Sequence, residues 1–167
     1  QKVIVFSQFT DTLAYVDSVL RAAHALSRQE WALVTGLLGA DVGHLIPERL
    51  TDGYGLQPGT IDRLHAEGAN VIVSVDCGIR APEAAHRASE LGIDLIITDH
   101  HEPDSELPKA VAVVNPKRAD CRYPDKNLAG VGVALKVVQG LCQKAGKDAW
   151  LNAFVKIAAI GTLADVV

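Results

Sequence analysis

The sequence predicts a single α/β domain: a mostly parallel β-sheet flanked by helices, with a helical C-terminal end. Two observations lead to this prediction. Short apolar runs alternate with amphipathic stretches, and one strand–helix–strand unit fills about 30 residues between Asn70 and Thr98. Beyond Leu128 the apolar spacing becomes that of helices. The length of 167 residues suits one domain with a sizeable core.

The first part of the chain shows two apolar runs typical of strands, two helical patterns and one turn. They are the strands Val3–Phe6 and Val42–Ile46, the helices Asp11–Leu26 and Thr60–Glu67, and the turn Asp52–Gly55. Gly68 is a typical stop for the second helix. The apolar run 31–38 is too short to assign by periodicity.

The strand–helix–strand unit is the clearest part of the sequence. Asn70–Val75 and Ile93–Thr98 are β-branched runs of equal length, and a helix from Pro82 to Leu91 lies between them, ended by Gly92. Such a unit places its two strands parallel in one sheet. The remaining expected elements are the strand Val111–Val114 and the helices Val131–Lys144 and Trp150–Val167.

Composition excludes several classes of protein. Hydrophobic residues make up 49% and charged residues 22%, which excludes a disordered chain, and a net charge of -4 excludes a uniformly basic surface but not a local basic stripe. The sequence contains no apolar run of ~18 residues, no signal-peptide layout and no CxxC spacing among its three cysteines. We therefore expect a cytoplasmic protein without a membrane segment. The absence of methionine suggests a fragment of a longer chain.

Two acidic and two histidine side chains follow the strands of this unit. Asp76 comes directly after the first strand, and Asp99, His100 and His101 come directly after the second. Neighbouring parallel strands lie about 4.8 Å apart, so these groups should meet at the carboxyl edge of the sheet, where open α/β folds bind ligands. Oxygen and imidazole ligands together suit Mn²⁺, with Mg²⁺ or Zn²⁺ as alternatives. Two other interpretations stay open: Asp76 as a helix N-cap, and the histidines as a turn former and a solvated ring.

Further residues could bind an anionic substrate near this cluster. They are Arg80, the basic stretch with Lys117, Arg118, Arg122 and Lys126, and the helix-opening glycines Gly130 and Gly132. Each has a simpler structural interpretation: helix capping for Arg80, a solvated loop for the basic stretch, and close helix-to-sheet packing for the glycines.

Three motifs occur in the order and spacing of the DHH phosphoesterase superfamily: Val75–Ile79 (VDCGI), Thr98–His101 (TDHH) and Gly161–Asp165 (GTLAD). Within that superfamily the chain most resembles the RecJ-type single-strand-specific 5′-to-3′ DNA exonucleases. The likeness covers about residues 39–167. It also includes Ile46–Arg49 with Asp52–Gly55, Val114–Pro116 and Leu128–Ala134.

The resemblance implies a two-metal phosphodiesterase that uses Mn²⁺ or Mg²⁺ and acts on single-stranded DNA in repair and recombination. It assigns Asp76 as a metal-bridging carboxylate, His100 and His101 as metal ligands or phosphate contacts, and Asp165 as a further ligand. Asp99 would orient the histidines. It also implies release of nucleoside 5′-monophosphates, a monomer, and a single-strand-binding protein as a partner.

The beginning of the chain departs from the family pattern. The family carries an Asp-x-Asp-x-Asp-Gly motif after its opening strand, whereas Ser7–Thr12 here contains one carboxylate, Asp11. Residues 1–38 are therefore atypical, and one of the two ions should bind weakly or be absent. The substrate-binding domain that the family places after the GTLAD motif is not in this sequence. Two alternatives follow: a catalytically silent scaffold or single-strand binder, and a phosphodiesterase for short oligonucleotides or cyclic dinucleotides.

Overall fold

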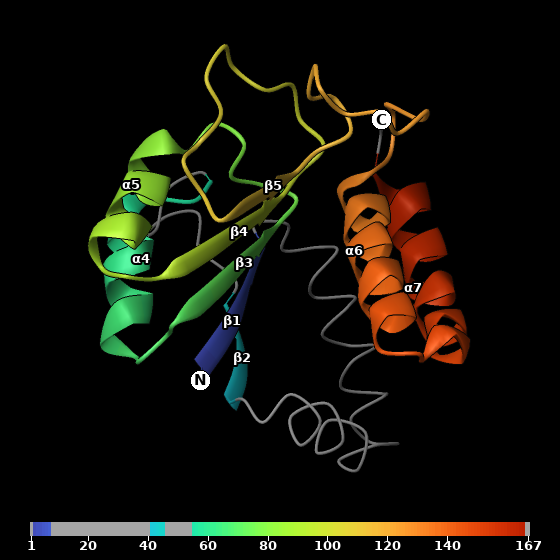
Figure 1. Ribbon diagram of the computed structural model, residues 1–167, viewed down its shortest axis with the longest axis horizontal. Coiled ribbons are helices and arrows are strands. Elements are labelled where there is room, and N and C mark those ends of the chain that lie inside the picture. The colour runs from blue at the N-terminus through green and yellow to red at the C-terminus, as the bar shows by residue number, and fades with distance from the viewer. Residues whose placement is uncertain (1, 8–40, 46–54, 166–167) are drawn as a thin grey trace.

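Five strands form one parallel sheet in the order β2-β1-β3-β4-β5 (Figure 1). The computed structural model describes residues 2–7, 41–45 and 55–165 of the chain. The strands are β1 Lys2–Ser7, β2 Asp41–Leu45, β3 Val71–Val75, β4 Asp94–Thr98 and β5 Ala112–Val114. The predicted α/β class with a parallel sheet is confirmed.

Helices cover both faces of this sheet (Figure 1). They are α4 Pro58–Ala66, α5 Pro82–Glu90, α6 Gly130–Lys144 and α7 Leu151–Ala164, with a short 3₁₀ turn, η1 Asp148–Trp150, before α7. Helices α4 and α5 pack against each other on one side, and α6 lies on the other with α7 beside it.

The strand–helix–strand unit β3–α5–β4 matches its prediction to within one residue at each boundary. Residues alternate in burial along β3, and Ile72 is fully buried together with Leu95 and Ile97 of β4. These side chains form the core with Leu56, Ile61, Leu64, Ala84, Ala85 and Ala88. β3 and β4 pair parallel with Val75 opposite Thr98, so both strands end at the same level.

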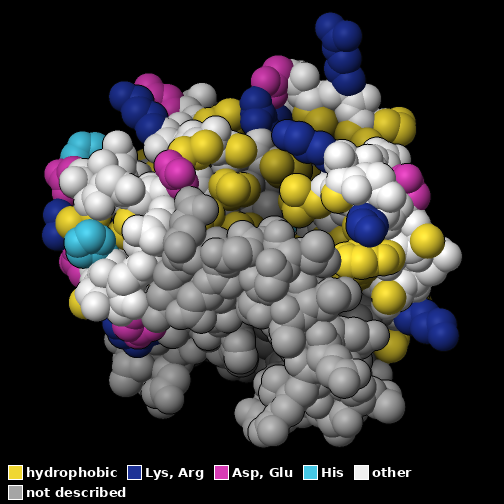
Figure 2. Space-filling model, turned by 60° about the horizontal axis from the view of Figure 1, so that its bottom comes forward, with side chains coloured by type: hydrophobic (Ala, Val, Ile, Leu, Met, Phe, Trp, Pro, Cys, Tyr) yellow, Lys and Arg dark blue, Asp and Glu magenta, His cyan; other side chains and the backbone are white. Residues whose placement is uncertain are grey.

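The two helical sides of the molecule have different surfaces. On the side of α4 and α5, at the left of Figure 2, acidic, basic and histidine side chains are mixed. On the side of α6 and α7 large hydrophobic side chains are exposed, among them Leu141, Phe154, Val155, Ile160 and Leu163. In the described part of the chain, no helix is both long and apolar enough to cross a membrane.

Some expectations differ from the structure or lie outside its described residues. The last helix, expected over Trp150–Val167, is shorter: α7 begins at Leu151, after the 3₁₀ turn that ends at Trp150, and it ends at Ala164 because Asp165 has an extended backbone. Other expectations fall outside the described residues. They are the helix 11–26 with Asp11, the run 31–38, the stretch Ile46–Arg49 and, except for Gly55, the turn Asp52–Gly55.

Candidate metal centre

The carboxyl edge of the sheet collects the predicted polar residues. Asp76 follows β3 and Asp99 follows β4. The N–H of Asp76 donates to the carbonyl of Thr98 at 2.8 Å, and the N–H of Asp99 donates to the carbonyl of Val114 at 3.0 Å. The backbone N–H of each aspartate is therefore hydrogen-bonded to the last residue of the neighbouring strand.

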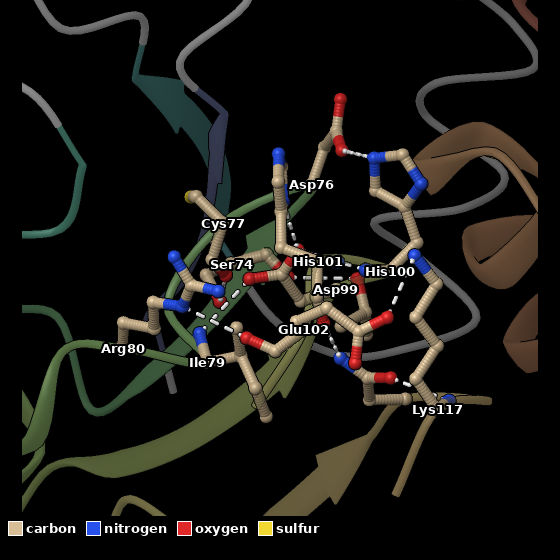
Figure 3. A network of polar contacts seen from close by, with 12 residues as sticks. Ser74, Asp76, Cys77, Ile79, Arg80, Asp99, His100, His101, Glu102 and Lys117 are labelled. Carbon is tan, nitrogen blue, oxygen red and sulfur yellow. Dashed lines mark hydrogen bonds and ion pairs between the residues drawn. The ribbon is translucent and has the colours of Figure 1, made fainter. Parts of the chain in front are cut away.

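Three side chains of kinds that bind metal ions lie together at this edge: Asp76, His100 and His101. Their potential ligand atoms lie within 4.8 Å of one another (Figure 3). His100 Nε2 lies 3.0 Å from Asp76 Oδ1 and 3.7 Å from Asp165 Oδ2. Asp165 comes from a distant part of the chain, directly after α7. The structure therefore brings together four of the predicted site residues from three segments.

The pKa of His100 is raised above its ordinary value. The main cause is the hydrogen bond from its ring to the Asp76 carboxylate, and the negative charges of Asp76, Asp165 and Asp99 add to it, while burial opposes the shift. The ring is thus held between carboxylates that favour a positive group. A divalent cation placed among these oxygens would experience the same attraction.

Asp99 organises the two loops. Its buried carboxylate accepts hydrogen bonds from the N–H groups of His100 at 2.7 Å, His101 at 3.1 Å and Ile79 at 2.9 Å. It also lies 2.6 Å from His101 Nδ1, which leaves Nε2 of that ring available to a ligand. Metal-binding histidines are commonly oriented by a carboxylate in this way. The geometry supports the orienting role that the resemblance implied for Asp99.

Asn115 is a second organising residue, and the sequence had suggested no role for it. It is buried, its Nδ2 donates to the carbonyl of His101 at 2.9 Å, and its Oδ1 accepts from the N–H of Lys117 at 2.8 Å. The sequence signal that could have identified Asn115 is its position directly after β5, because that strand also ends at the carboxyl edge of the sheet.

The donor set fits a divalent cation. Two ligands on opposite sides of one ion are separated by about 4–4.4 Å, close to the spread of the three ligand atoms here. Among the described residues, buried His100 Nδ1 has no hydrogen-bond partner, which is unusual for a polar atom in a protein interior. The alternative of Asp76 as a helix cap is wrong, because α5 begins at Pro82 and its N-cap residue is Ala81.

Arg80 lies beside the metal centre. Together with His101 and Asp99 it lines a cavity of about 180 Å³. Its Nε donates to the carbonyl of Glu102 at 2.8 Å and lies 3.6 Å from Asp104, while the side chain stays largely exposed (Figure 3). The location is compatible with contact to an anionic substrate.

The predicted basic stretch is partly engaged in holding its own loop. Arg118 pairs with Asp120 and donates to the carbonyl of Val113, and Lys126 donates to two loop carbonyls. Arg122 is exposed. The loop interpretation therefore accounts for Arg118 and Lys126, and Arg122 is left as a candidate substrate contact.

The two helix-opening glycines differ in their surroundings. Both are buried in the first turn of α6. Gly130 faces the Asp76 side chain, whereas Gly132 faces the side chain of Leu128. Both positions are closely packed, Gly130 against the loop after β3 and Gly132 against the residue two positions before α6.

Comparison with known proteins gives consistent matches. A model described as "DHH family, N-terminal domain" matches residues 2–162. The chain is 41% identical over 138 residues to the single-stranded-DNA-specific exonuclease RecJ of Escherichia coli K12, covering 77% of the chain and 24% of that protein. It is 45% identical over 130 residues to RecJ of Bacillus subtilis 168, covering 78% and 16%.

A solved structure gives a similar result. The crystal structure of exonuclease RecJ bound to manganese superposes with a TM-score of 0.75 at 30% identity, covering 99% of this chain and 39% of that one. The chain thus spans less than half the length of each of these relatives.

Proposed function

The chain belongs to the DHH family, and from this premise we propose that it is the metal-binding part of a phosphodiesterase acting on single-stranded DNA. The observation that supports this most directly is the convergence of Asp76, His100 and His101 at the carboxyl edge of the sheet, with ligand atoms within 4.8 Å of one another. The names of the relatives, single-stranded-DNA-specific exonucleases, supply the substrate class.

Asp76, His100 and Asp165 are the proposed metal ligands, because their side chains face one another in a partly buried position. A bound Mn²⁺ or Mg²⁺ would polarise the phosphate and lower the pKa of a water nucleophile. His101, oriented by Asp99, presents its second ring nitrogen to the ion or to a phosphate oxygen. The atypical Ser7–Thr12 stretch lacks the carboxylates of the family motif, so we propose one strong site and a second that is weak or absent.

On the substrate side we propose that Arg80 and Arg122 contact the phosphate backbone. Both are exposed, and Arg80 lines the cavity next to His101. The same proposal includes hydrolysis in the 5′-to-3′ direction with release of nucleoside 5′-monophosphates. It also includes a monomeric cytoplasmic protein with a role in repair and recombination and a single-strand-binding protein as a partner.

A second candidate is a catalytically silent domain that binds single strands or acts as a scaffold. The observation that favours it is the replacement of the Asp-x-Asp-x-Asp-Gly motif, since fewer carboxylates weaken metal binding. Metal binding and hydrolysis distinguish the two candidates.

The test uses a 5′-labelled single strand with Mn²⁺ and compares the chain with Asp76→Asn. Asparagine keeps the size of the side chain and tolerates the left-handed backbone of this position, so the change removes mainly the charge. Asp94→Asn is the matched control, because Asp94 is exposed at the opposite end of β4. We expect Mn²⁺-dependent hydrolysis that falls about 100-fold in Asp76→Asn and is unchanged in the control. Equal, metal-independent background in all three proteins would favour the silent domain.

Calorimetry counts the Mn²⁺ ions bound per chain. We expect one strong site in the parent and a loss of affinity in Asp76→Asn. A parent chain that binds no Mn²⁺ would contradict the proposed function.

A further inference from the structure

We propose that Gly130 is a positioning residue for Asp76: the absence of a side chain at the start of α6 provides the space that the Asp76 carboxylate needs at the metal centre. The inference rests on the proposed function in one respect, because it gives Asp76 the role of a metal ligand. The packing itself is a property of the fold and is tested separately below.

The distances leave no room for a side chain at this position. A Cβ atom on Gly130 would lie 2.2 Å from Oδ1, 2.3 Å from Cγ and 2.7 Å from Cβ of Asp76. Non-bonded carbon atoms prefer separations of about 3.5–4.0 Å. Because the Cβ of Asp76 is itself too close, rotating its side chain would not remove the overlap. Either the loop after β3 or the start of α6 has to move.

Asp76 has little freedom to accept such a shift. Its φ is 64°, and it is the sole non-glycine residue with positive φ in the described part of the chain. Its N–H is bonded to the carbonyl of Thr98 at 2.8 Å, and its carboxylate lies 3.0 Å from His100 Nε2. Any movement of Asp76 away from α6 therefore changes its separation from the neighbouring ligand.

Other glycines of α6 do not share this environment. A Cβ on Gly140 would meet no atom within 4 Å. A Cβ on Gly132 would lie 3.2 Å from Leu128 Cδ2, which is the far end of a flexible side chain. The requirement for glycine is thus strongest where the helix approaches the proposed metal ligand.

The experiment compares Gly130→Ala with Gly140→Ala, the same change in the same helix. We expect Gly130→Ala to lower Tm by about 5 °C, because overpacking destabilises a buried site. Gly140→Ala should raise Tm by roughly 2–4 °C, because alanine is the better helix former. Mn²⁺ affinity measured by calorimetry should fall about 10-fold or more in Gly130→Ala and stay unchanged in Gly140→Ala.

A double variant identifies the partner of the clash. Asp76→Gly removes the three atoms nearest to the new Cβ, all of which belong to the Asp76 side chain, and glycine adopts positive φ without strain. In the Asp76→Gly background, Gly130→Ala should no longer lower Tm. If Gly130→Ala alone does not fold, recovery of folding in the double variant supports the proposal, and failure of both overturns it.

The outcomes separate this inference from the proposed function. An equal loss of Tm in both backgrounds, or parental Mn²⁺ affinity in folded Gly130→Ala, overturns the positioning role. A parent chain that binds no Mn²⁺ contradicts the proposed function, whereas the melting comparison still decides whether Gly130 accommodates Asp76.

Discussion

Replacing Asp99 should destabilise the fold more than any other single change at the sheet edge. Its carboxylate is 1% exposed and accepts hydrogen bonds from three backbone N–H groups and the ring of His101. In Asp99→Ala all four donors lose their partner. The N–H groups of Ile79 and His100 are buried, and each buried donor left unsatisfied costs about 1–3 kcal/mol, whereas the part-buried donors of His101 can bond to water. Allowing for partial relaxation, we expect a loss of about 3–5 kcal/mol in the free energy of unfolding. A domain is typically stable by about 5–15 kcal/mol, so this is a large fraction.

Urea unfolding of the metal-free chain measures this loss, and Tm should fall by roughly 10 °C. Asp99→Asn should lie between the parent and Asp99→Ala, because the amide keeps one acceptor oxygen but turns an NH₂ group toward the remaining donor. Asp94→Ala is the control, since Asp94 is exposed at the other end of the same strand, and it should change stability by less than about 0.5 kcal/mol. If Asp99→Ala unfolds at the same urea concentration as Asp94→Ala, the carboxylate does not hold the two loops together.

Three further predictions concern the same edge. Because the pKa of His100 is raised in the folded chain, its protonated pairing with Asp76 stabilises the metal-free fold fully below about pH 6.5 and is lost as the pH rises through the folded pKa. Unfolding free energy should therefore decrease with rising pH, and His100→Asn should abolish that dependence. Asn115→Ala should cost about 1–3 kcal/mol of stability and reduce hydrolysis, since it removes the donor to the carbonyl of the second histidine; unchanged melting and activity would contradict this role. Arg122→Ala should weaken single-strand binding and reduce the salt slope by about 0.7, whereas Arg118→Ala should lower Tm, because its side chain is bonded within its loop. Binding titrations at several salt concentrations distinguish the two arginines.

The sequence by itself determined the sheet unit and the location of the candidate site. The β-branched runs before Asp76 and Asp99 predicted two strands, because β-branched residues favour strands. The helix between them, which begins at Pro82 and is ended by Gly92, predicted that the two strands are parallel. Parallel strands end at one edge, so local pattern was sufficient to place Asp76 near His100 and His101. The family motifs added Asp165, which no local pattern distinguishes from an ordinary polar residue.

Only the tertiary structure decided how these residues are held. Three of the contacts that hold them join segments that are far apart in the chain. They are the hydrogen bond that Asp99 accepts from Ile79, the bond from Asn115 to His101 and the contact of Gly130 with Asp76. Local propensity carries no information about such contacts, because they depend on which loops the sheet order and helix packing bring together. For the same reason the sequence could not show that Arg118 is bonded to the carbonyl of Val113 in β5, since a charged residue has the same local pattern whether it faces a substrate or a neighbouring carbonyl.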